Sequence, residues 1–174
     1  MGRSLVIDTT VTRAAGDDAA TSPVSIQCRD FLKAVLAICH KFVVTPEIQD
    51  EWRKHRSRFS STWLTAMDAR KKVIRIAAPE IQPIRNKINE VNESHPKAAM
   101  TKDLHLIEAA SVTDGLIVSM DEEVRNLFNE NSQRIGQLKN LVWVNPCKPE
   151  DTALEWLQEG ALTEKERQFG SAEV

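Results

Sequence analysis

Three aspartates occupy positions at which an α/β fold would bring their carboxylates together. Asp8 closes the apolar segment of residues 5–7, and Asp121 follows the apolar segment of residues 116–119. Asp103 lies near the expected start of the helix that precedes the second segment. Because ligands bind at the carboxyl ends of parallel strands, we expect the three carboxylates to meet at one edge of a sheet.

The helix after the second expected strand offers a fourth acid. Glu47, Asp50 and Glu51 are the candidates, and residues 47 and 51 share a helix face because they are four positions apart. Several carboxylates without compensating charge would raise one another's pKa. A hard divalent cation such as Mg²⁺ relieves that repulsion, taking one or two carboxylates directly and keeping several waters. Such a site could activate a water for attack on a phosphodiester, with one metal ion or two.

Each acid also has an ordinary structural explanation, since 25 of the 174 residues are acidic. Asp8 could be a helix cap or a turn residue, and Asp103 could be the N-cap of its helix. Asp121, followed by Glu122 and Glu123, could complement the N-terminus of a helix. A metal site is therefore indicated by the set and not by any single residue.

Short apolar strands alternate with helices along the chain, which is the pattern of an α/β fold with a parallel sheet. We expect strands at residues 5–7, 42–45, 116–119 and 141–144, while residues 72–76 could be a strand or a connection. Cap-plus-Pro signals at Ser22-Pro23 and Thr45-Pro46 predict helices that reach about residues 40 and 71. Further helices are expected at residues 79–93, where His95-Pro96 ends the helix, from about 97 or 101 to 112, and at 122–130.

The chain is expected to form one domain over residues 1–146, followed by a short helical extension over residues 147–174. Thr163 opens a capping-box pattern in that extension. Its apolar residues could cover the core or form a homodimer contact, and we favour covering the core. They are Leu154, Trp156, Leu157 and Leu162.

Composition is typical of a globular protein, with 41% hydrophobic and 28% charged residues. No segment approaches the ~18 apolar residues of a membrane span, and Asp8 ends the first apolar run too early for a signal peptide. Cys28, Cys39 and Cys147 lack paired spacing, which favours a reducing compartment over a disulfide framework or a thiolate zinc site. Cys28 and Cys39 are expected to be buried in one helix. We therefore expect a cytoplasmic protein without a membrane partner.

Net charge is -2, which does not by itself indicate a nucleic-acid partner. The distribution of charge is more informative, because Arg53, Lys54, Arg56 and Arg58 place four positive charges within six residues. This basic cluster could contact phosphates. It could equally be a solvated helix face that is balanced by the acids just before it.

Four segments resemble, in order, the motifs of PIN-domain nucleases. Val-Ile-Asp-Thr-Thr-Val at residues 6–11 is similar to the family's first strand, which ends in Asp-Thr-Asn. Residues 42–52 resemble the second motif, a strand and then a helix carrying Glu before a bulky residue. Residues 102–110 match the third motif, and residues 116–121 match the fourth, where the family usually has Thr-x-Asp. The resemblance covers about residues 4–145.

Carried over residue by residue, the resemblance implies that the metal-binding and catalytic acids are Asp8, Glu51, Asp103 and Asp121. Ser119 would be the hydroxyl neighbour that orients them, with Thr9 and Glu47 in supporting positions. Glu51 matches the second motif better than Glu47 because Trp52 occupies the bulky position. Two features depart from the family: Thr10 replaces the usual Asn, which would weaken the positioning of Asp8, and the tail extends beyond the minimal core.

The family implies a PIN-like (Rossmann-like) central parallel sheet flanked by helices and a dependence on Mg²⁺ or Mn²⁺. It further implies hydrolysis of single-stranded RNA, commonly by VapC-type toxins whose antitoxin partner blocks the site. The basic cluster would then bind RNA. The alternative is a catalytically weak or inactive PIN-like scaffold that binds RNA or a protein partner.

Other chemistries lack their signatures. A haloacid-dehalogenase-type phosphatase needs a second Asp where Thr10 stands, and a response-regulator receiver needs an acidic pair and a late Lys. Neither a GxSxG elbow nor a GxxxxGK[ST] loop occurs. His105 shares a helix with Asp103 but would face about 200° away, so we expect it to be structural.

Overall fold

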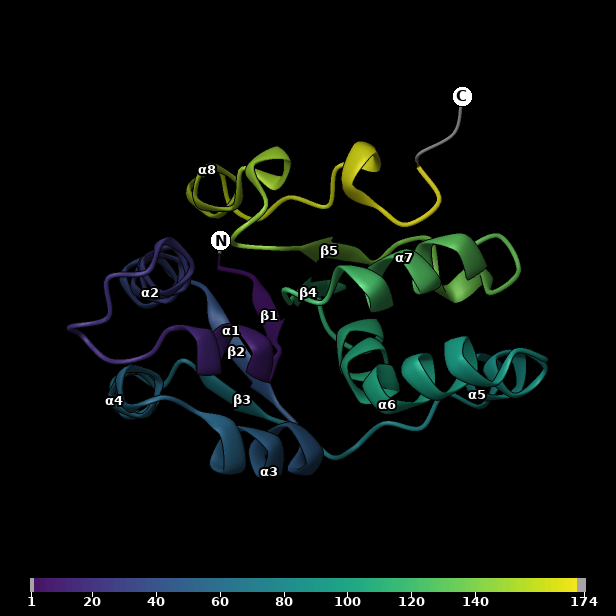
Figure 1. Ribbon diagram of the computed structural model, residues 1–174, viewed down its shortest axis with the longest axis horizontal. Coiled ribbons are helices and arrows are strands. Elements are labelled where there is room, and N and C mark those ends of the chain that lie inside the picture. Colours follow the sequence, from purple (N-terminus) through teal and green to yellow (C-terminus); the bar gives the residue numbers. More distant parts are fainter. Residues whose placement is uncertain (1, 172–174) are drawn as a thin grey trace.

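Apolar, β-branched segments form the strands of a single sheet in the computed structural model, which describes residues 2–171. The strands are β1 (Ser4–Ile7), β2 (Lys41–Val44), β3 (Val73–Arg75), β4 (Leu116–Val118) and β5 (Val142–Val144). All neighbours are parallel, in the order β3-β2-β1-β4-β5 (Figure 1). The predicted α/β fold with a parallel sheet is confirmed, and the ambiguous segment of residues 72–76 contains a strand.

The strand order reverses between β1 and β4. From β1 the chain moves outward through β2 and β3, then returns to place β4 on the other side of β1 and β5 beyond it. The loops that leave β1 and β4 therefore diverge at the carboxyl edge of the sheet. Open α/β sheets bind their ligands at such a switch point.

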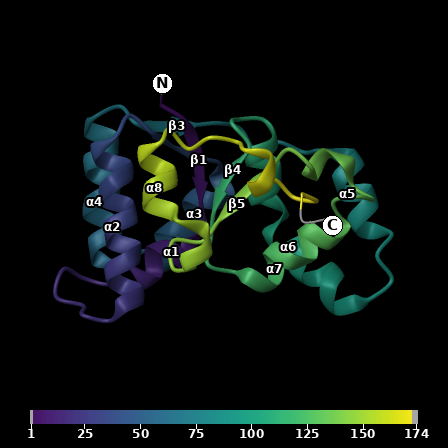
Figure 2. The ribbon, with the colours of Figure 1, turned by 90° about the horizontal axis from the view of Figure 1, so that it is seen from above.

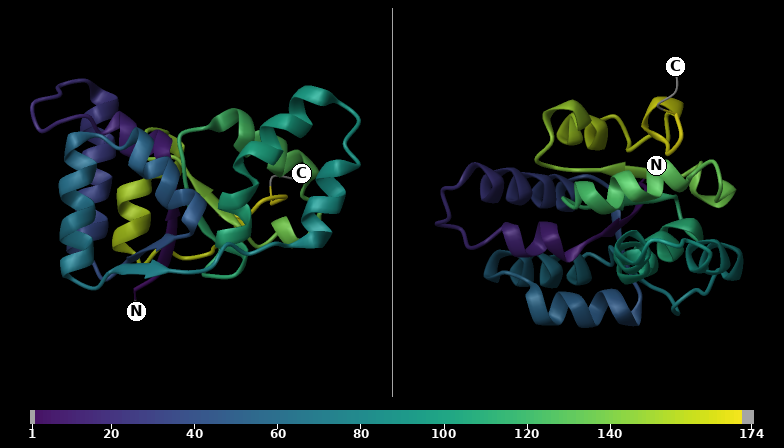
Figure 3. Two further views of the ribbon diagram at one scale, coloured as in Figure 1. Left: turned by 90° about the horizontal axis from the view of Figure 1, so that it is seen from below. Right: turned by 45° about the vertical axis from the view of Figure 1, so that its right-hand side comes forward.

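Helices cover both faces of this sheet, as in Rossmann-like folds. On one face lie α2 (Pro23–Ala37), α4 (Arg58–Ala69) and α8 (Ala153–Gln158), and on the other α5 (Gln82–Asn89), α6 (Ser94–Ser111) and α7 (Glu122–Asn131) (Figure 2). Two further helices, α1 (Thr9–Ala14) and α3 (Pro46–His55), pack against each other, and α1 lies at the end of the sheet opposite the N-terminus (Figure 3). Short 3₁₀ segments occur at Gly136–Leu138, Pro149–Asp151 and Lys165–Arg167. Within residues 2–171, no helix is both long and apolar enough to cross a membrane.

The predicted caps and an aromatic cluster position α3. The Thr45 hydroxyl accepts a hydrogen bond from the backbone N–H of Ile48, as the Ser22 hydroxyl does for Ser25 at the start of α2. Trp52 packs against Phe42 and Trp63 with ring centroids 4.5 and 5.7 Å away. Its indole N–H also donates to the carbonyl of Ile7 over 2.9 Å, which ties α3 to the end of β1.

Three helix predictions are wrong. The expected long helix from Thr45 to about residue 71 is two helices, because Arg56 is extended and the Ser57 hydroxyl caps α4. α6 begins at Ser94 and not at residue 97 or 101, since Pro96 fits within the first turn of a helix. Residues 9–14, which are not among the expected helices, form α1 because Asp8 caps them.

The prediction that Cys28 and Cys39 are buried in one helix also needs correction. Cys28 is buried in α2, but Cys39 lies beyond the end of the helix at Ala37 and is exposed. The two cysteines therefore do not share a helix, and only Cys28 is a core residue.

The C-terminal extension lies on the domain. Trp156 and Leu157 of α8 are 1% and 0% exposed, which confirms that they cover the core, whereas Leu154 and Leu162 stay 40% and 44% exposed. Thr163 begins no capped helix; a 3₁₀ turn without a side-chain cap follows it. The domain boundary at residue 146 stays a prediction.

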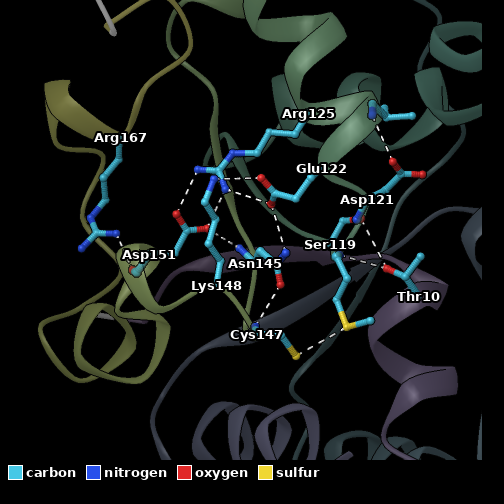
Figure 4. A network of polar contacts seen from close by, with 12 residues as sticks. Thr10, Ser119, Asp121, Glu122, Arg125, Asn145, Cys147, Lys148, Asp151 and Arg167 are labelled. Atoms are coloured by element: carbon cyan, nitrogen blue, oxygen red, sulfur yellow. Dashed lines mark hydrogen bonds and ion pairs between the residues drawn. The ribbon is translucent and has the colours of Figure 1, made fainter. Parts of the chain in front are cut away.

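An ion pair holds the extension to α7. The Asp151 carboxylate is 7% exposed and receives two hydrogen bonds from Arg125, of 2.7 and 3.0 Å. It also accepts from the backbone N–H of Asn145 over 2.7 Å (Figure 4). Burial would lower the pKa of Arg125, but its contacts with Asp151 and Glu122 outweigh burial and raise it.

Asp151→Asn should lower the free energy of unfolding by about 2 kcal/mol, because the amide cannot replace both charge-assisted bonds to Arg125. Urea unfolding at pH 7 measures the change. The matched control is Asp30→Asn, whose carboxylate is exposed and 4.0 Å from the Lys33 ammonium, and which should shift stability by less than about 0.5 kcal/mol. Equal effects of the two substitutions would contradict a structural role for Asp151.

Candidate active site

Asp8 is fixed at the end of β1 by three close hydrogen bonds. Its Oδ1 accepts from the backbone N–H of Thr9 over 2.7 Å, which caps α1. Its Oδ2 accepts from the hydroxyls of Thr10 at 2.6 Å and Ser119 at 2.8 Å. The residue is 6% exposed, so a buried carboxylate is held rigidly at the switch point.

Thr10 contributes more than its departure from the family pattern suggested. We expected the replacement of Asn by Thr to weaken the positioning of Asp8. Instead, the Thr10 hydroxyl donates to Asp8 and accepts from the backbone N–H of Met120 over 3.1 Å. Thr10 therefore links the loop after β1 to the loop after β4.

Ser119 connects the two aspartates that follow the central strands. While its hydroxyl donates to Asp8, the same oxygen accepts from the backbone N–H of Asp121 over 3.1 Å (Figure 4). Asp121 Oδ1 caps α7 by accepting from the N–H of Val124 over 3.0 Å. Among residues 2–171 nothing donates to Asp121 Oδ2, so this oxygen is available to a ligand. Asp8 and Asp121 are therefore helix caps, as their structural explanation predicted, and they also lie in the candidate site.

Asp103 lies well inside α6 and not near its start, because the helix begins at Ser94. It is therefore no N-cap. The residue is 6% exposed, and no group within residues 2–171 donates a hydrogen bond to it; the exposed Lys102 ammonium is 3.9 Å away. Burial raises the pKa of Asp103 to about 6, and the negative charges of Asp8 and Asp121 add to this rise while Lys102 opposes it. The three aspartates thus lie close enough to repel one another.

Glu51 and His105 form a pair beside the aspartates. His105 Nε2 lies 3.1 Å from Glu51 Oε2, and Nδ1 lies 3.1 Å from the carbonyl of Lys102. Both ring nitrogens face acceptors, so the protonated imidazolium satisfies both contacts. Burial would lower the pKa of His105, but Glu51 and the charge of Asp103 outweigh burial and raise it. The hydrogen bond from His105 in turn lowers the pKa of Glu51.

Sequence reasoning missed His105, which we expected to be structural because it faces away from Asp103 on the helix. α3 packs against α6 on that side and brings Glu51 to His105. No spacing along the chain signals this pair, since its members are 54 residues apart. Only the packing of α3 reveals it.

The other predicted residues lie outside this group. Glu47 is exposed in the first turn of α3 and makes no hydrogen bond or ion pair with the described residues, which favours Glu51 as the second-motif acid. The basic cluster Arg53, Lys54, Arg56 and Arg58 is exposed where α3 ends and α4 begins.

A small cavity lies beside the basic cluster. Arg53, Arg56 and Arg75 line a cavity of about 200 Å³ whose other walls include Trp52 and Leu64. The Arg53 guanidinium also lies 3.4 Å from the exposed carboxylate of Asp50, so its charge is partly balanced. The cluster therefore presents cations next to Trp52, the neighbour of Glu51 in sequence.

Within residues 2–171, no three His, Cys, Asp or Glu side chains are arranged as a ready-made metal site. No model of a known protein family matches the chain. No curated protein matches it either. The site is defined by its geometry: three aspartates gather at the switch point, two of them buried, and the Glu51–His105 pair lies beside them.

Proposed function

We propose that the protein is a PIN-type ribonuclease that depends on a divalent metal ion and hydrolyses phosphodiester bonds of single-stranded RNA. The observation that carries the proposal is the meeting of Asp8, Asp103 and Asp121 where β1 and β4 diverge. The order of the four PIN-like motifs along the chain supports the same function, since three motifs contribute these aspartates and the second motif contributes Glu51 beside them.

The donor set fits Mg²⁺ or Mn²⁺. Asp103 is a buried carboxylate without a hydrogen-bond donor among the described residues. Burial raises its pKa first, and the charges of Asp8 and Asp121, which a cation would neutralise, raise it further. Asp121 Oδ2 accepts no hydrogen bond from residues 2–171 and Asp8 is held in place, so one or two of these oxygens could bind the ion directly and the rest through water. When bound, the ion supplies an activated water and charge stabilisation for attack on phosphorus.

The neighbouring side chains position this acidic group. Ser119 and Thr10 hold the Asp8 carboxylate in one orientation. His105 orients Glu51 and keeps it ionised, so that Glu51 completes the set of acids. The exposed basic cluster then offers cations to the phosphates of an RNA strand that approaches along α3.

One observation favours the second candidate function, a PIN-like scaffold with weak or no cleavage. Glu51 is engaged by His105, and no group of three ligands is preformed in the described part of the chain. Such a scaffold would bind RNA through the basic cluster or bind a protein partner. An active enzyme could be the toxin of a toxin–antitoxin pair, with an antitoxin or a second copy of the chain as its protein partner.

Cleavage of a mixed pool of labelled single-stranded RNA distinguishes the two functions. Wild-type protein with Mn²⁺ or Mg²⁺ should shorten the RNA, and EDTA should stop the reaction. Retention of RNA in a filter-binding assay without cleavage under any metal condition would support the scaffold. If the protein neither cleaves nor binds RNA, the result would contradict both the ribonuclease and the RNA-binding scaffold.

A further inference from the structure

Three sulfur atoms from distant parts of the chain converge beside the acidic group. The thiol of Cys28 on α2 lies 3.3 Å from the thioether of Met120 and 3.7 Å from the thiol of Cys147. The Cys147 and Met120 sulfurs are 3.7 Å apart. We call these three side chains the sulfur triad.

The triad has the dimensions of a metal site. A triangle with sides of 3.3, 3.7 and 3.7 Å has a centre about 2.1 Å from each corner, and metal–thiolate bonds are about 2.3 Å long. The sulfurs would need to move outward by only about 0.2 Å to accept an ion at the centre. These dimensions therefore suit an ion with three ligands in a nearly planar arrangement.

The ligand chemistry selects the ion. Two cysteines and one methionine offer only soft sulfur donors, which favour Cu(I). Mg²⁺ and Mn²⁺ prefer oxygen, and structural zinc requires a fourth ligand. We propose that the sulfur triad binds one Cu(I) ion through the thiolates of Cys28 and Cys147 and the thioether of Met120. Binding releases the two thiol protons to solvent and leaves the oxidation state of copper unchanged.

The surrounding structure holds the ligands ready and leaves an entry path. Cys28 is 0% exposed, whereas Met120 and Cys147 are partly exposed, so the ion can enter from the side of Cys147. The backbone N–H of Cys147 donates to Asn145 Oδ1 over 2.9 Å, and that of Met120 donates to the Thr10 hydroxyl. The copper site requires none of the acidic residues, so it stands apart from the proposed ribonuclease activity.

Cys39 provides a matched control because it is a free, exposed cysteine outside the triad. The experiment is an anaerobic titration of the full chain with Cu(I) in competition with a chromogenic chelator. Wild type and Cys39→Ala should each hold one equivalent. Cys147→Ala should lose the site, and Met120→Leu should bind at least about tenfold more weakly, since it removes one of three ligands.

X-ray absorption gives a readout that separates ligation from a general effect on folding. Copper should have three sulfur neighbours in wild type and two in Met120→Leu. Thiol counting before the titration must give three free thiols, so that a Cys28–Cys147 disulfide is excluded. Wild type that has three free thiols and holds no Cu(I), or folded Cys147→Ala that still binds like wild type, would overturn the proposal.

Discussion

Asp8→Asn and Asp121→Asn should each slow RNA cleavage by about a thousandfold or more, because each removes a negative charge where the divalent ion would bind. Both residues lie at the point where β1 and β4 diverge. The Ser119 hydroxyl donates to the Asp8 carboxylate and accepts from the backbone N–H of Asp121. Initial rates of cleavage in saturating Mn²⁺, compared with wild type, measure the effect.

The fold should survive both substitutions. Asn caps helices about as well as Asp, so the caps of α1 and α7 persist. The hydroxyls of Thr10 and Ser119 can rotate to accept from the new amide. Asp50→Asn, an exposed acid on the same helix as Glu51, is the matched control and should cleave like wild type. Unfolding of the two variants would instead assign these acids a structural role.

Asp103→Asn should abolish cleavage and yet stabilise the metal-free protein at pH 7.5 by up to about 3 kcal/mol. Asp103 is buried beside Asp8 and Asp121, and its pKa is raised to about 6. A group with a raised pKa binds its proton more tightly in the folded state, so ionising it disfavours folding. An amide of the same shape carries no charge and avoids that cost.

The raised pKa of Asp103 in the folded state also determines how stability depends on pH. The free energy of unfolding of the metal-free wild type should fall as pH rises from about 4 through 6, and the fall should be smaller in Asp103→Asn. The two proteins should be equally stable at pH 4, where the carboxyl is protonated. Mg²⁺ or Mn²⁺ should stabilise wild type more than the variant. If Asp103→Asn were less stable than wild type at pH 7.5, this would contradict the inference that the ionised Asp103 carboxylate destabilises the metal-free fold.

The strands were predictable because their signal is local. Runs such as residues 5–7 and 116–118 are apolar on both faces, as a buried parallel sheet requires. Helix boundaries were less predictable because proline is ambiguous. Pro46 begins α3, whereas Pro96, which the sequence pattern places at the end of a helix, lies in the first turn of α6.

Part of the candidate site could likewise be predicted from the sequence, and part of it could not. Asp8 and Asp121 directly follow strands, so the parallel sheet alone brings them to one edge. The Glu51–His105 contact depends on how α3 packs against α6, and the sulfur triad depends on where α2 meets the loops after β4 and β5. Residue spacing predicts neither the Glu51–His105 contact nor the sulfur triad, because each joins elements that are distant in sequence.

The extension after β5 also covers part of one edge of the sheet. Gln168 pairs antiparallel with Val142, the Phe169 N–H donates to the Leu141 carbonyl over 3.0 Å, and the Phe169 ring packs on Trp143. An open strand edge is a template for strands of other molecules. Here residues 168–169 pair with the start of β5, so this part of the sheet edge is less open to strands of other molecules.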